Sequence, residues 1–131
     1  MDKTLIASDL ISLYVESISK ADTASFRSLW SGKDNTLVSI GRLYRGVDEI
    51  VDDFLLGTVG RKYTSIKLLT DDIKIIDASD SLVIVIFRFH ADTVLRKNDK
   101  PYGFQGLETQ IIVKTDKGWK FQHIHYSKRS D

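Results

Sequence analysis

Several residue types and features are scarce in this chain of 131 residues. It contains no cysteine, a single proline and three histidines. Without cysteine, the chain has no disulfide framework, no thiolate zinc site and no thiol nucleophile. The longest apolar run, LVIVIF at residues 82–87, is too short to span a bilayer. Because the N-terminus lacks the basic start and apolar run of a secretory signal, we expect a cytoplasmic protein that does not bind a membrane.

The chain also has little net charge and few recognisable motifs. Nineteen basic and 18 acidic residues leave a net charge of +1, which gives no electrostatic footprint for nucleic acid. Neither a phosphate-binding loop nor a G-x-S-x-G nucleophile elbow is present, and we expect no cofactor. The 42% hydrophobic fraction, with no Gly/Ser/Pro-rich linker, indicates one domain over residues 1–131.

Helical periodicity occupies the first half of the chain. An apolar stripe over residues 8–21 predicts a helix with Ser8 as its N-cap. Asp22 is placed to cap a second, short helix that ends before Gly32. A short strand follows in NTLVSIG, and the spacing of apolar residues predicts a third helix over residues 46–57.

Strand patterns replace the helical ones from Lys62 onward. The predicted strands are residues 63–70, 72–77, 81–92, 104–115 and 118–127. Helices followed by an antiparallel meander predict an α+β fold in which the helices cover one face of the sheet. In LVIVIF both alternating sets are apolar, which predicts a sheet covered on both faces. With no further helices available, a second copy of the chain is the simplest second cover, so we expect a homodimer.

Polar and apolar side chains alternate on the three last strands in a way that is typical of a small-ligand pocket. The predicted pocket side chains on these strands are Arg88, His90, Glu108, Gln110, Gln122 and Tyr126. Tyr14 and Trp30 add two candidate ligand contacts from the helices, although residues at this spacing also suit a core. Arg88 either pairs with Glu108 or stays free to bind a ligand carboxylate.

The two histidines in GWKFQHIHYS are predicted to serve the sheet surface. Metal binding by His123 and His125 needs further ligands, and strand parity sends His90 to the opposite face, so we expect no metal site. The predicted dimer contact combines this set with the apolar set of the preceding strand: Trp119, Phe121, His123, His125, Thr109 and Ile111.

Several motifs together resemble a known superfamily. They are the Ala-Asp turn before a short helix that ends in Trp30, the segment YRGVDEI, and the closing GWKFQHIHYS. The chain is similar to SnoaL-like, nuclear transport factor 2-like proteins, with the association domain of calcium/calmodulin-dependent protein kinase II as the nearest group. This resemblance implies a cone-shaped α+β domain (cystatin-like in its sheet), with N-terminal helices in the concave face of a curved, mostly antiparallel sheet. It also implies a pocket between them and dimers through the outer sheet face.

The resemblance assigns roles to particular residues. Arg88 matches an inward arginine of the association domain and Glu108 matches a carboxylate, whereas Gln110 and Tyr126 stand where that group has two further arginines. In the steroid isomerases of the superfamily, Tyr14 corresponds to the oxyanion-donor tyrosine and Glu108 lies near a carboxylic-acid donor. The general base falls at about Ser39, and an unactivated serine cannot remove a carbon-bound proton near neutral pH.

Three functional hypotheses follow. The first is a homodimeric pocket domain for a small, partly apolar ligand, which a carboxylate near Arg88 would suit. The second is a lyase, cyclase or isomerase-type enzyme, with Glu108, His90 and Tyr14 as catalytic candidates. The third is an oligomerisation module, as the kinase resemblance implies.

Overall fold

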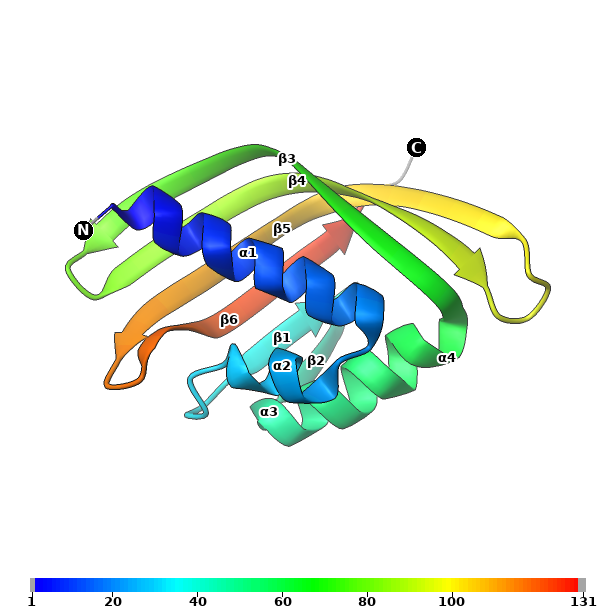
Figure 1. Ribbon diagram of the computed structural model, residues 1–131, viewed down its shortest axis with the longest axis horizontal. Helices are drawn as coiled ribbons and strands as arrows, with labels where there is room; N and C mark the ends of the chain where they lie inside the picture. The colour runs from blue at the N-terminus through cyan, green and yellow to red at the C-terminus, as the bar shows by residue number, and fades with distance from the viewer. Residues whose placement is uncertain (1, 130–131) are drawn as a thin grey trace.

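The computed structural model describes residues 2–129 (Figure 1). The helices are α1 (Lys3–Lys20), α2 (Thr23–Ser28) and a continuous helical segment made of α3 (Gly46–Glu49), η1 (Ile50–Val59) and α4 (Gly60–Lys62). The strands are β1 (Thr36–Ser39), β2 (Arg42–Arg45), β3 (Tyr63–Ser79), β4 (Leu82–Leu95), β5 (Pro101–Thr115) and β6 (Gly118–Lys128). They form one six-stranded sheet in the order β2-β1-β6-β5-β4-β3. Its β1–β6 pair is parallel and its other pairs are antiparallel.

The sheet is curved, and the helices lie on its concave side (Figure 1). α1 runs across the long strands, while α2 and the α3–α4 segment lie beside the short strands β1 and β2. Apolar side chains from the helices and from the concave face form one buried cluster between the two layers. The α+β class and the curved, mostly antiparallel sheet confirm the fold predicted from the sequence.

α1 begins six residues earlier than its apolar stripe predicts, with the N-cap at Asp2 instead of Ser8. Asp2 is the N-cap, and its Oδ1 accepts a hydrogen bond from the Thr4 backbone N–H at 2.9 Å. The prediction of Ser8 as the cap is wrong, because the first turn carries the exposed Leu5 and so lacks the periodic signal. Asp22 caps α2 as predicted, by accepting from the Ser25 N–H at 3.1 Å.

β3 is one strand where the sequence predicts two. The acidic pair Asp71-Asp72 reads as a turn, but it forms a bulge between Asp71 and Lys74 in the pairing with β4. Asp72 adopts a positive φ of 49°, which lets the strand bend without reversing. The helix predicted over residues 46–57 is present and continues to Lys62, with a π-helical middle in η1.

The face that each residue of β4 occupies differs from the prediction. Phe87 and Phe89 are buried on the concave face, whereas Arg88 and His90 are exposed on the outer face. Both alternating sets of side chains are equally apolar at the start of the strand, so the first half does not indicate which set faces the core. Farther along, Phe89 continues the apolar set, which identifies the inward face.

A bulge in β6 separates Trp119 and Phe121 from the two histidines of the strand. Ile112 pairs with Phe121 and Ile111 with His123, so Gln122 is the extra residue. Phe121 is therefore fully buried in the core, and Trp119 also packs against the core. The prediction that these two aromatics lie at the outer face is wrong, because the bulge reverses the alternation after Phe121.

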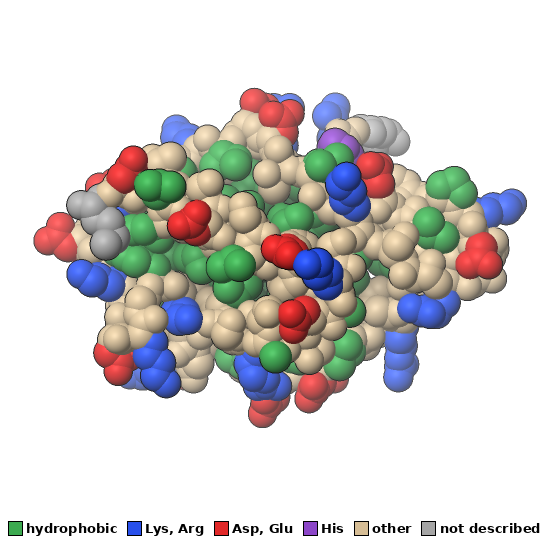
Figure 2. All heavy atoms as spheres, in the orientation of Figure 1, with side chains coloured by type: hydrophobic (Ala, Val, Ile, Leu, Met, Phe, Trp, Pro, Cys, Tyr) green, Lys and Arg blue, Asp and Glu red, His purple; other side chains and the backbone are tan. Residues whose placement is uncertain are grey.

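Acidic and basic side chains are interspersed over the helix-bearing face of the molecule (Figure 2). Hydrophobic side chains are visible between them (Figure 2). On α1, the side chains of Leu5 and Leu13 are exposed. Over residues 2–129, no helix combines the length and the apolar character needed to cross a bilayer.

Candidate functional site

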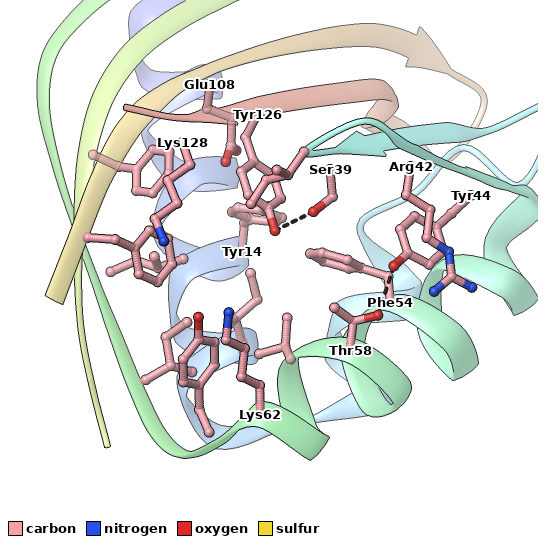
Figure 3. Close-up of a pocket in the computed structure, with 18 residues that line it drawn as sticks. Tyr14, Ser39, Arg42, Tyr44, Phe54, Thr58, Lys62, Glu108, Tyr126 and Lys128 are labelled. Carbon is pink, nitrogen blue, oxygen red and sulfur yellow. Dashed lines mark hydrogen bonds between the residues drawn. The ribbon is translucent and has the colours of Figure 1, made fainter. Parts of the chain in front are cut away.

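A cavity of about 260 Å³ lies between α1, the end of the η1–α4 segment and the concave face of the sheet (Figure 3). Its walls are mostly apolar, and they include Ile18, Phe54, Val59, Ile66, Leu68 and Phe89. Apolar walls with a few placed polar groups are the usual lining of a small-ligand pocket. The polar groups of this cavity fall into an inner group and a rim.

Glu108 and Tyr14 form the centre of the inner group. Cross-strand pairing places Glu108 of β5 between Phe87 of β4 and Tyr126 of β6, so its side chain points to the concave side. Gln110 donates a hydrogen bond from Nε2 to Glu108 Oε2 at 2.7 Å, and the Tyr14 hydroxyl donates to the same carboxyl group. Both Glu108 and Tyr14 are almost fully buried.

Burial determines the protonation of this pair. Loss of hydration raises the pKa of Glu108 from 4.5 to about 8, and the hydrogen bonds from Gln110 and Tyr14 offset only part of that rise. Burial, together with the nearby Glu108, also raises the pKa of Tyr14 well above its ordinary value. Near neutral pH both groups are therefore uncharged, and the carboxylic acid has a proton to donate.

Tyr126 and Ser39 form a second polar pair beside Glu108. Ser39 Oγ donates to the Tyr126 hydroxyl at 2.5 Å, as Figure 3 shows. Burial raises the pKa of Tyr126 to about 12. Ser39 is positioned by the parallel pairing of β1 with β6, which sets it directly opposite Tyr126. Neither group can act as a base near neutral pH.

The η1 helix supplies the opposite wall. Phe54 and Thr58 project from it into the pocket, and Thr58 Oγ1 lies 2.8 Å from the Tyr44 hydroxyl (Figure 3). The Arg42 guanidinium covers the Tyr44 ring, with 4.6 Å between its Cζ and the ring centroid. Sequence reasoning missed these residues, since β2 is too short to give a periodic signal. The i, i+4 spacing of Phe54 and Thr58 could have indicated a shared helix face.

Two lysines complete the rim. Lys62 at the end of α4 and Lys128 at the end of β6 both line the pocket, and Figure 3 shows their amino groups directed into it. Neither lysine is predicted as a pocket residue from the sequence, because nothing in their local pattern distinguishes them from solvated lysines.

The structure brings together three of the side chains predicted to contact a ligand and separates the others. Tyr14, Glu108 and Tyr126 line the cavity, and Gln110 lies behind Glu108. Arg88 and His90 do not line the cavity, because both are on the outer face. The predicted alternatives for Arg88 are both wrong: its ionic neighbour is Asp72, at 3.5 Å, and its side chain is 65% exposed.

Trp30 and Gln122 serve the framework instead of the cavity. Trp30 is buried beside Phe26 and Phe121, with ring centroids about 6 Å apart. The Gln122 side chain projects from the β6 bulge and donates to the Lys33 and Asp34 carbonyls at 2.7 and 3.1 Å. It anchors the loop between α2 and β1.

The remaining residues of the predicted dimer contact lie on the outer face. Cross-strand pairs join His123 to Ile111 and His125 to Thr109. His123 Nδ1 lies 2.7 Å from the Thr36 Oγ1 on the neighbouring strand β1. Partial burial and the adjacent His125 lower the pKa of His123.

Known proteins share this fold, in which helices cover the concave face of a curved sheet. The family model of the SnoaL-like domain matches residues 7–129. The chain therefore belongs to the SnoaL-like domain family. No curated protein sequence matches it significantly.

Solved structures extend the comparison. A nuclear transport factor 2-like superfamily protein from Salmonella enterica superimposes with a TM-score of 0.91 at 25% identity, over 97% of this chain and 91% of that one. Hexachlorocyclohexane dehydrochlorinase LinA-type3 from Novosphingobium barchaimii gives 0.86 at 15% identity, over 98% and 87%. A protein from Xanthomonas campestris, provisionally described as a calcium/calmodulin-dependent protein kinase II association domain, gives 0.81 at 12% identity, over 95% and 86%. These similarities confirm the superfamily indicated by the sequence.

Proposed function

We propose that this protein is a homodimeric binding domain for a small, largely apolar molecule that carries a carbonyl or hydroxyl oxygen. The observation that carries the proposal is an apolar cavity that ends at a buried, uncharged Glu108 paired with Tyr14. A protonated carboxyl group in an apolar site is a strong hydrogen-bond donor that needs no counter-ion. An oxygen of the ligand would accept this proton while the apolar body fills the cavity.

The pH dependence of binding tests this proposal. A suitable probe is 2-naphthamide, which is small, mostly apolar and uncharged throughout the range used. Because binding needs neutral Glu108, whose pKa is about 8, affinity should fall about tenfold between pH 7 and pH 9. Isothermal titration calorimetry measures this fall directly.

Substitutions at position 108 provide the controls. Glu108→Gln keeps an uncharged donor, so its affinity should stay constant between pH 7 and pH 9. Glu108→Ala should bind weakly at both pH values. Equal affinity of the unmodified protein at pH 7 and pH 9 would contradict the proposed role of Glu108.

A second candidate function is proton-transfer catalysis, as in a lyase, cyclase or isomerase. It is favoured by a specific observation: with a pKa of about 8, Glu108 can both release and accept a proton near neutral pH. Tyr14 or Tyr126 would then stabilise charge that develops on the substrate oxygen. The dehydrochlorinase among the similar structures shows that this fold hosts an enzyme. If a substrate is found, Glu108→Gln should bind it without turning it over.

The dimer is proposed to form through the outer face of the sheet. On this face two rows of side chains run across the strands, one through Val38, His125 and Thr109, the other through His123 and Ile111. On β4 the first row continues to Ile86 and the second row to Ile84. Leu43, beside Val38, ends the first row on β2, and Ile76, beside Ile84, ends the second row on β3; both side chains are exposed. We call these residues the outer patch. A second copy covering the outer patch would remove this apolar surface from water.

A further inference from the structure

Three basic side chains surround the pocket: Arg42 on β2, Lys62 on α4 and Lys128 on β6. They come from three separate parts of the chain. Figure 3 shows Lys62 and Lys128 on one side of the cavity, with Arg42 on the other. The fold alone brings the two lysines to the same place.

Lys62 and Lys128 lie against one aromatic ring. Their Nζ atoms are 5.9 and 4.9 Å from the centroid of the Tyr102 ring. Lys128 Nζ also donates a hydrogen bond to the Tyr102 hydroxyl. This hydrogen bond, together with the charges of both lysines, lowers the pKa of Tyr102. Two ammonium groups therefore share one small region at the mouth of the pocket, although like charges repel.

Within the described part of the chain, no carboxylate forms an ion pair with either lysine. Among residues 2–129, the ion pairs involve Lys3, Lys20, Arg27 and Arg88, and none of them joins Lys62 or Lys128 to an acid. Of the residues that the structure describes, Glu108 is the single acidic one in the pocket lining, and its raised pKa leaves it uncharged at neutral pH. The pocket thus combines an uncharged inner end with a positive mouth.

We propose that Lys62 and Lys128 bind a carboxylate of the ligand, while its apolar body fills the cavity and carries, at the inner end, the oxygen that accepts from Glu108. This inference rests on the proposed binding function and narrows the ligand class to small apolar carboxylates. Two ammonium groups, each with several rotatable donors, suit the two oxygens of one carboxylate. Lys62 and Lys128 at the mouth therefore take the carboxylate-binding role that the sequence pattern predicts for Arg88, which lies on the outer face of the sheet.

A matched pair of probes tests the inference. The carboxylate 2-naphthoate and the uncharged 2-naphthamide have the same ring and similar size. Calorimetric titration at pH 6.5 and low ionic strength keeps Glu108 protonated and screening weak. The unmodified protein should bind 2-naphthoate about tenfold more tightly than 2-naphthamide, as expected for two partly exposed charge contacts.

Substitution of both lysines should abolish this preference. In the double variant Lys62→Met/Lys128→Met, the two probes should bind with nearly equal affinity. The double variant Lys33→Met/Lys117→Met removes the same charge at exposed positions outside the pocket lining. It should keep the tenfold preference. Circular dichroism checks that each variant is folded.

The outcomes separate this inference from the proposal on which it rests. If 2-naphthamide binds but the preference for 2-naphthoate is absent, or survives in Lys62→Met/Lys128→Met, the carboxylate mouth is wrong and the binding pocket stands. If the control variant loses the preference equally, the net charge of the protein is responsible and the mouth is again wrong. If neither probe binds the unmodified protein, the proposed binding function falls and the inference falls with it.

Discussion

The two faces of strands β5 and β6 differ in how they satisfy their polar groups. On the concave face, Glu108 and Gln110 are buried and Tyr126 is half-buried, and all three interact with partners inside the same chain. On the outer face, Thr109 and Ile111 alternate with them and remain partly exposed. The polar groups of the concave face thus have partners within the chain, whereas the outer face presents apolar surface to solvent.

This difference shows how one pair of strands can serve two purposes. A change on the concave face should act on folding and on ligand binding. A change on the outer patch should act on association and leave the monomer intact. The predictions below test this division, from the largest expected effect to the smallest.

The largest effect is expected from the pH dependence of stability at Glu108. In the folded protein its pKa is about 8, and in the unfolded chain it returns to about 4.5. The stabilising contribution is therefore fully present below pH 4.5 and is lost as the pH rises through 8, because the unfolded chain releases the proton first. At about 1.4 kcal/mol per pKa unit, the loss totals ~5 kcal/mol.

Urea denaturation at pH 5 and pH 8.5 measures this loss, most of which falls between these two values. Glu108→Gln carries no titrating proton, so its free energy of unfolding should change much less between them. A similar change in the unmodified protein and in Glu108→Gln would assign the pH dependence to other groups.

The next effect is expected at Phe121. The sequence pattern predicts this residue at the dimer contact, but the structure places it in the core. Phe121 is fully buried and packs edge-on against Tyr14, with centroids 5.6 Å apart. Phe121→Ala should therefore lower the free energy of unfolding by ~4 kcal/mol, as for other buried aromatics. His125→Ala, at an exposed position four residues away on the same strand, should change it by less than about 0.5 kcal/mol. Denaturation at a protein concentration where both variants are monomeric gives the comparison.

The inner end of the site could be predicted from the sequence, because each of its residues obeys a local rule. Glu108 and Gln110 alternate with apolar residues on a strand of regular period, and Tyr14 lies on the apolar stripe of a helix. The fold class follows from the order of helical and strand patterns. None of these inferences needs information about distant contacts.

The rest depends on contacts that no local pattern records. Lys62 and Lys128 are 66 positions apart in the chain, and only the folded structure brings them to the same ring. The sequence pattern places Arg88 in the pocket, wrongly, because its strand begins with two equally apolar faces. The β6 bulge follows from the fit of β6 against the loop after α2, where Gln122 hydrogen-bonds to two carbonyls.

A charge within the outer patch should prevent association. Ile111 pairs with Ile84 on β4 and with His123 on β6, which places it inside the outer patch. Ile111→Asp would bury a carboxylate in the proposed interface, so the dimer should weaken about 100-fold or more. Lys117→Asp, at the β5–β6 turn, should leave the dimer unchanged. Sedimentation velocity decides the outcome, and a dimer that persists in Ile111→Asp would place the interface elsewhere.

The smallest effect is expected from the histidines of the outer patch. The pKa of His123 is lowered by its partial burial and by the neighbouring His125, so association that buries it further favours the uncharged ring. Acidification from pH 7.5 to pH 5.5 should then increase the protonated fraction of His123 and weaken the dimer, by several-fold at most. The double variant His123→Gln/His125→Gln removes both rings and should associate equally at the two pH values. If the variant keeps the same pH dependence, other groups cause it; if neither protein responds, the histidines lie outside the interface even when Ile111 lies within it.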